Sequence, residues 1–92
     1  MIVRVLGEGQ FRLDDAAFAA VHAIDDRVLA CADADDAEGF ATALEELVTE
    51  IKRAGTPLAL DEFTGSDAVV PSAGTTLDEA RALLSSEGLI PN

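Results

Sequence analysis

The chain has 92 residues, which suffice for one domain with a modest core but not for a deep internal active-site cavity. Eighteen Asp and Glu residues against six Lys and Arg residues give a formal net charge of −12 at pH 7. Because phosphate groups bind clustered Lys and Arg, this composition argues against nucleic acid as a partner and against direct binding to anionic membranes.

The first elements predicted along the chain are the two strands of a β-hairpin. Two short apolar runs, residues 2–6 and 11–13, flank the Gly-Glu-Gly segment 7–9, a sequence that favours a tight turn. In the second run apolar and polar residues alternate, which gives the strand one face toward a core and one toward water. Since a lone hairpin is barely stable in water, the rest of the chain must cover it.

A first helix is predicted from Asp14 or Asp15, either of which is a good N-cap, to about Ala32. Its apolar residues recur at helical spacing, and Asp25 falls at the edge of this apolar stripe. The stripe consists of Phe18, Val21, Ile24, Val28 and Leu29.

A second amphipathic helix is predicted over residues 36–54. Asp35 and, three residues later, Glu38 resemble a capping box, and Gly55 provides a stop signal. Only a few residues connect this helix to the first, so we expect the two to form an antiparallel pair.

The segment 56–75 is predicted to be extended and loop-like, including the run 58–60 and the polar stretch 61–65. Residues 68–70 are apolar and partly β-branched, and Pro71 follows them. Because proline cannot donate to a sheet ladder, we expect a third strand here at a sheet edge.

A short third helix is predicted to begin at the Thr76 capping box, with Glu79 as its other member. We expect its apolar face to consist of Leu77, Ala80, Leu83 and Leu84. Gly88 then fits a left-handed C-terminal cap. Leu89 and Ile90 form an apolar tail that is either docked on the core or offered to another molecule.

Together these elements predict an α+β fold over a single domain, residues 1–92. An N-terminal β-hairpin and a short third strand pack against an antiparallel helix pair and a short C-terminal helix.

No set of residues predicts catalysis, a cofactor or a metal. His22 and Cys31 lie nine residues apart on one helix, which separates them by about 13 Å along the axis. Counted from Asp33, the fifth, sixth and twelfth positions hold Ala37, Glu38 and Leu44, where a calcium-binding EF-hand loop needs an oxygen ligand, Gly and Glu. The adjacent acidic pairs 25–26 and 45–46 diverge on their helices, so neither converges on a substrate atom. We expect a protein that is not an enzyme.

The acidity has two explanations. A salt-rich cytosol makes dense surface acid tolerable, and the shortage of Lys favours such a halophilic origin. The alternative is a basic partner, for which the protein would act as a DNA mimic or anti-regulator. The chain has no run of about 18 apolar residues, no signal-peptide pattern and only one cysteine, so we expect a cytoplasmic location.

Three segments resemble the PspA-associated protein family, PspAA. They are MIVRVLGEGQFRLDD (1–15), GSDAVVP (65–71) and TLDEARALLSSEGLIP (76–91). The resemblance implies a cytoplasmic partner of PspA, the membrane-associated coiled-coil protein of the phage-shock envelope-stress response. It implies a non-enzymatic adaptor or regulator that reaches the membrane through its partner, and it transfers no binding residues.

Physical reasoning adds a candidate docking surface. Glu8, Gln10 and Arg12 lie beside a hairpin edge that another strand could join, and Leu89 and Ile90 form the apolar tail. The partner would lay a helix in an apolar groove or add a strand to the sheet. The same edge could pair two copies of the chain into a homodimer.

Overall fold

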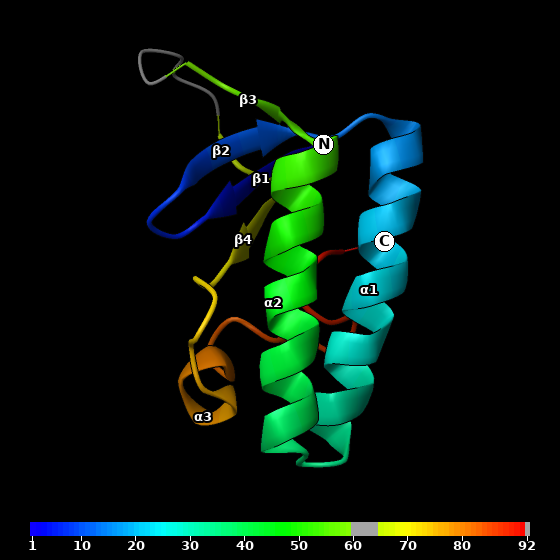
Figure 1. Cartoon of the computed structure of the whole chain (residues 1–92), viewed down its shortest axis with the longest axis vertical. Helices are drawn as coiled ribbons and strands as arrows, with labels where there is room; N and C mark the ends of the chain where they lie inside the picture. The colour runs from blue at the N-terminus through cyan, green and yellow to red at the C-terminus, as the bar shows by residue number, and fades with distance from the viewer. Residues whose placement is uncertain (60–64, 92) are drawn as a thin grey trace.

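A computed structural model of the chain describes residues 1–59 and 65–91. It consists of a small β-sheet, two long helices that pack side by side, and a short helix near the C-terminus (Figure 1). The expected α+β architecture is therefore confirmed. Within the described residues, no helix is long and apolar enough to span a membrane.

The sheet has four strands in the order β3-β2-β1-β4, with the predicted hairpin at its centre. The strands are β1 (Ile2–Val5), β2 (Gly9–Arg12), β3 (Thr56–Pro57) and β4 (Ala68–Val70). β2 is antiparallel to both of its neighbours, whereas β4 runs parallel to β1. The third strand expected at residues 68–70 is confirmed, and it lies at an edge as expected. The two-residue strand β3 was not predicted.

The helices α1 (Asp15–Asp33) and α2 (Ala37–Ala54) form the predicted antiparallel pair. The carboxylate of Asp14 caps α1 by accepting a 2.8 Å hydrogen bond from the amide of Ala17. In Figure 1, α2 crosses in front of the strands and α1 lies beside it.

The N-cap of α2 corrects the sequence prediction. The carboxylate of Asp36, not that of Asp35, accepts the hydrogen bond from the amide of Gly39, at 3.0 Å. Asp35 has a positive φ of 55°, because it turns the chain between the two antiparallel helices. Asp is one of the few residues other than Gly that adopts this left-handed conformation at small cost.

The third helix is shorter than expected. α3 spans only Leu77–Ala80, and the Thr76–Glu79 capping box is formed as predicted. Beyond α3 the chain continues in turns, so Gly88 does not cap a helix, although its φ is positive as expected. Leu83 was assigned to the buried face and is instead 37% exposed.

One continuous core joins the layers. The side chains of β1 and β2 that face the helices, Val3, Val5 and Phe11, are buried in the same cluster as the stripe of α2. The stripe of α2 consists of Phe40, Ala43, Leu44, Leu47, Val48 and Ile51. The C-terminal tail joins this cluster too. The helices thus cover one face of the sheet.

Candidate functional site

Two of the three hairpin residues predicted to bind a partner have contacts within the chain. An oxygen of Glu8 lies 3.0 Å from the ammonium nitrogen of Lys52 on α2. The side-chain amide of Gln10 donates a 2.9 Å hydrogen bond to the hydroxyl of Ser66. Arg12 and Glu8 are exposed, whereas Gln10 is half-buried.

Arg12 lies on the sheet face opposite the helices, which we call the open face. In the register of the hairpin, Arg4 is opposite Gln10 and Ile2 is opposite Arg12. Side chains alternate along a strand and paired residues share a face, so these four residues lie on the side opposite Val3 and Phe11. By the same registers, Val69 of β4 and Thr56 of β3 lie on this face. Ile2 is only 6% exposed and Gln10 contacts Ser66, so the face is covered around these two residues and exposed at Arg4 and Arg12.

Arg4, which was not among the residues predicted from the sequence, lies on the same face as Arg12. The alternation of Val3, Arg4 and Val5 in the sequence is a signal for an outward arginine. Its position next to Arg12, however, depends on which residues the hairpin pairs. Both arginines are exposed.

The two arginines differ from the other basic residues in their pairing. Arg27 pairs with Glu46, Lys52 with Glu8, Arg53 with Glu50, and Arg81 with Asp35. Within residues 1–59 and 65–91, neither Arg4 nor Arg12 has a carboxylate partner. The open face therefore presents two arginine side chains without a carboxylate partner among the described residues.

The C-terminal tail is docked on the core and does not present its side chains to solvent. Leu89 is 5% exposed and Ile90 is fully buried. Of the two alternatives for this tail, the structure has the docked one, so these two side chains offer almost no surface to a partner in this conformation. In Figure 1 the tail passes behind the helix pair.

A buried carboxylate holds the tail in place. Asp25, in the middle of α1, is 1% exposed, and its two oxygens accept hydrogen bonds of 3.0 Å from the amides of Leu89 and Ile90. A Cβ on Gly88 would lie 2.5 Å from an oxygen of Asp25, so the close approach also requires glycine there. The sequence placed Asp25 at the edge of an apolar stripe and gave no signal for this partner 64 residues away.

Burial of the Asp25 carboxyl raises its pKa above the usual value, because removal from water disfavours the charged form. The amides of Ile90 and Leu89 and the charge of His22 oppose this rise without reversing it. Asp25 is the only charged or polar residue among the described residues that is buried in this way. Its two hydrogen bonds to the tail give Asp25 a structural role.

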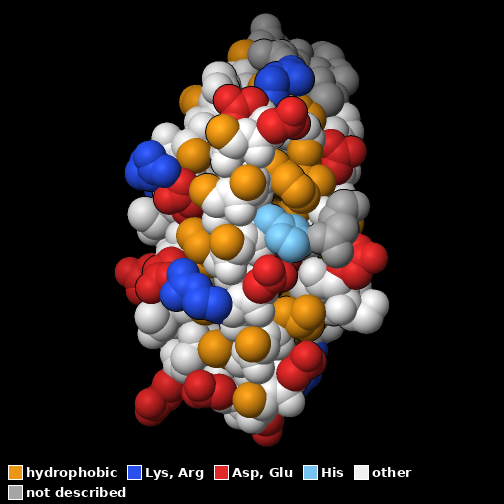
Figure 2. All heavy atoms as spheres, turned by 90° about the vertical axis from the view of Figure 1, so that its right-hand side faces the viewer, with side chains coloured by type: hydrophobic (Ala, Val, Ile, Leu, Met, Phe, Trp, Pro, Cys, Tyr) orange, Lys and Arg blue, Asp and Glu red, His pale blue; other side chains and the backbone are white. Residues whose placement is uncertain are grey.

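His22 lies at the surface of α1 and not in a cavity. Its Nδ1 is 3.7 Å from a carboxylate oxygen of Asp26, one turn along the helix, and its ring lies 5.5 Å from that of Phe18. Figure 2 shows the imidazole among scattered apolar and acidic side chains on this side of the molecule. Cys31, near the end of the same helix, is half-buried.

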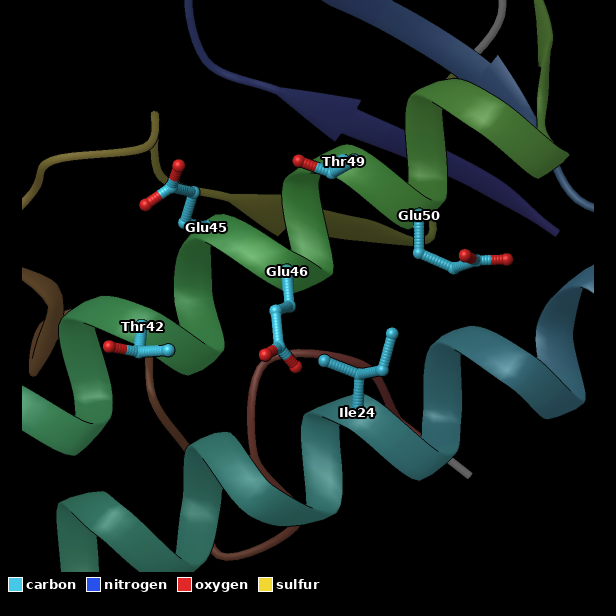
Figure 3. Close-up of a pocket in the computed structure, with 6 residues that line it drawn as sticks. All are labelled: Ile24, Thr42, Glu45, Glu46, Thr49 and Glu50. Carbon is cyan, nitrogen blue, oxygen red and sulfur yellow. The ribbon is translucent and has the colours of Figure 1, made fainter.

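A shallow groove of about 410 Å³ runs between α1 and α2. Figure 3 shows Glu46 of α2 pointing toward Ile24 of α1, while Glu45 points away from it. The remaining lining residues are Thr42, Thr49 and Glu50. Glu46 pairs with Arg27 across the helices, and a hydrogen bond from Arg53 lowers the pKa of Glu50. Glu46 and Glu50 are thus each paired with an arginine and Glu45 points away, so the three carboxylates do not converge on one point.

Comparison with known proteins gives a match along the full length of the chain. A family model described as PspA-Associated protein, PspAA, matches residues 1–92. No curated protein and no solved structure matches the chain.

Proposed function

Because the chain belongs to the PspA-associated protein family, we propose that it is a non-enzymatic adaptor or regulator that binds PspA or a related component of the membrane-stress response. The observation that carries this proposal is the family match over residues 1–92, which leaves no part of the described fold outside the family. The partner is a PspA-type coiled-coil protein.

Charge supports an indirect connection to the membrane. A net charge of −12 repels anionic lipid headgroups, so the protein reaches the membrane through its partner and not by itself. In this proposal the protein resides in the cytoplasm and becomes membrane-associated only when its partner is.

The arrangement of titratable groups supports a role other than catalysis. A general acid or base and a nucleophile must lie within hydrogen-bond reach of each other and of a bound substrate. The imidazole of His22 instead faces Asp26 at the surface, and the carboxylate of Asp25 accepts backbone amides of the tail. Each of these groups has a structural contact that accounts for its position.

The experiment that tests this function is a direct binding measurement with the PspA-type protein encoded in the same genome. Isothermal titration calorimetry at the salt concentration of the native cytosol should show saturable binding. An unrelated coiled-coil protein of similar net charge is the control and should give none. If both titrations are flat, the proposal fails; equal binding to both would reduce it to a non-specific charge effect.

Self-association is the second interaction to measure, because the exposed edge of a sheet can pair with its own copy. Light scattering behind a size-exclusion column reports the mass in solution, with and without the PspA-type protein. If the dimer dissociates when the PspA-type protein binds, both interactions use one surface. If the dimer persists, self-association and PspA binding use different surfaces. The DNA-mimic hypothesis has no support in the family match.

A further inference from the structure

We propose that the open face of the sheet binds an acidic segment of the protein partner and that Arg4 and Arg12 hold the carboxylates of that segment. This assignment rests on the proposed function and deepens it, because it names a surface and the chemistry of what binds there. The helices occupy the opposite face, so the partner segment would lie on the sheet without displacing the core.

The first support is how charge is distributed over the fold. The four strands contain no Asp or Glu, although these residues number 18 in the chain. The same strands contain both arginines that have no carboxylate partner within the described residues. In a chain with so many acidic residues, two adjacent unneutralised arginines on one face form a local site of opposite sign.

The second support is the spacing of the two arginine positions on the sheet. Arg4 is opposite Gln10, and Arg12 is two residues further along β2, so the arginines are diagonal neighbours across the strand pair. Such neighbours lie about 7–8 Å apart. Carboxylates two residues apart on an extended strand, or one turn apart on a helix, are separated by roughly 5–7 Å. Two side chains of one acidic segment therefore match the two arginines.

The third support is what surrounds the arginines. Val69, half-buried, lies beside Arg4 in the register with β4, and Ile2 is the cross-strand neighbour of Arg12. When a segment covers the exposed arginines, these apolar neighbours help to exclude water and so strengthen each charge-assisted hydrogen bond relative to bulk water. Guanidinium groups are suited to this role because their planar fork binds a carboxylate through two parallel hydrogen bonds.

A protein segment fits this face better than a membrane or a nucleic acid. Two arginines neutralise only two phosphates, whereas stable binding to a polyanion needs many such contacts. Charges are screened beyond about 8 Å at physiological ionic strength, so a single narrow segment can contact the arginines with little repulsion from the rest of the molecule.

The test compares two double variants of equal net charge in the calorimetric titration with the PspA-type protein. R4Q/R12Q removes the arginines of the open face, and R27Q/R53Q removes two arginines of α1 and α2 that are paired within the chain. We expect R4Q/R12Q to bind roughly tenfold more weakly or worse, and R27Q/R53Q to stay within about twofold of the unchanged protein. Far-UV circular dichroism establishes that both variants are folded.

The outcomes separate the surface from the function. If the unchanged protein binds and R4Q/R12Q binds equally well, the open face is not the docking surface and the proposed function stands. If the unchanged protein does not bind, the proposed function fails, and the surface is tested with a synthetic peptide of alternating Glu and Ser. The proposed docking surface stands if the peptide shifts the amide resonances of Arg4, Gln10, Arg12 and Val69 and if R4Q/R12Q shows no such shifts. It is overturned if none of these resonances changes in the unchanged protein.

Vesicles provide the remaining comparison. Flotation with anionic phosphatidylglycerol vesicles should leave the protein unbound. Binding of the unchanged protein, lost in R4Q/R12Q and kept in R27Q/R53Q, would assign the open face to a lipid surface and overturn the choice of a protein segment.

Discussion

At the scale of single residues, Asp25 has the least expected environment in the chain. A carboxylate with 1% exposure accepts two backbone amides from residues that are 64 and 65 positions away in sequence. Both amides would be buried donors without a partner if the side chain were lost, and each unsatisfied donor costs about 1–3 kcal/mol. Asp25 therefore fixes the end of the chain to the middle of α1.

We predict that D25N lowers the free energy of unfolding by about 1–3 kcal/mol. The amide side chain keeps one acceptor oxygen and turns an NH2 group toward the second backbone amide. Urea denaturation followed by far-UV circular dichroism measures the change, since the chain has no Trp or Tyr. The control is D26N, one residue along and at the surface, which should change stability by about 0.5 kcal/mol or less. Equal effects of the two variants would contradict the role of Asp25.

The raised pKa of Asp25 predicts a pH dependence with a definite sign. The folded state holds the Asp25 proton to a higher pH than the unfolded state, whose value is near 3.8. The stability from this group is therefore fully present below 3.8 and is lost as pH rises through the folded pKa. The stability of the unchanged protein relative to D25N should increase as pH falls from neutrality toward 4. A difference that decreases over this range would show that burial does not dominate the pKa.

At the scale of elements, the turn between α1 and α2 determines that Asp36, and not Asp35, is the N-cap of α2. Asp36 accepts the amide of Gly39, and a Cβ on Gly39 would lie 2.4 Å from the carboxylate of Asp36 and 3.0 Å from the sulfur of Cys31. Glycine at this position thus lets the cap and the end of α1 approach each other.

We predict that D36A lowers the free energy of unfolding by about 1 kcal/mol, the typical cost of losing an N-cap. D35N is the matched control, because Asn tolerates the positive φ and only the exposed pair with Arg81 weakens, worth at most about 1 kcal/mol. Chemical denaturation of both variants decides which aspartate is the cap. A larger loss for D35N would restore the capping box expected from the sequence.

The tail that follows α3 is the second element with a clear test. Ile90 is fully buried, so I90A should remove about 2–5 kcal/mol of stability through lost burial and a cavity. L83A is the comparison on the same segment, and with 37% exposure it should cost only about 0.5–1 kcal/mol. Thermal unfolding followed by circular dichroism measures both. A mild I90A variant would mean that the tail is not docked in solution.

At the scale of the whole molecule, self-repulsion is the dominant electrostatic effect. The ion pairs that link distant parts, such as Lys52 with Glu8 and Arg81 with Asp35, join exposed side chains and contribute little individually. They neutralise a minority of the acidic groups, and the remaining like charges destabilise the folded state at low ionic strength.

Added salt should therefore stabilise the protein. Raising KCl from about 0.05 M to about 1 M shortens the screening length severalfold, and we predict a rise in Tm of roughly 5–10 °C. The same titration near the isoelectric point of about 4.1 should give a much smaller rise, because little net charge remains to be screened. If Tm at neutral pH does not change with KCl concentration, self-repulsion does not limit stability. The physical argument for a halophilic origin would then fail as well.

Sequence patterns were sufficient for the hairpin, both long helices and the strand at residues 68–70, because periodicity and turn residues are local signals. They failed where a contact joins distant parts of the chain. Asp25 looked like a residue at the edge of a stripe, and only the docked tail supplies the amides that explain its burial. Strand β3 was missed since two residues carry no periodicity and acquire a strand geometry only by pairing with β2. The loop predicted over residues 61–65 lies almost entirely outside the described residues.

The sequence by itself determined the class of fold, the capping box at Thr76, the acidic surface and the family of this protein. It left the N-cap of the first helix open between Asp14 and Asp15, and the structure has Asp14. The tertiary structure decided that the tail is docked and that Arg4 and Arg12 share one open face. The physical reason is the range of the interactions. Helix caps, side-chain alternation and hairpin register depend on neighbours a few residues away, whereas the face of the sheet that the helices cover and the burial of a carboxylate depend on which distant segments pack together.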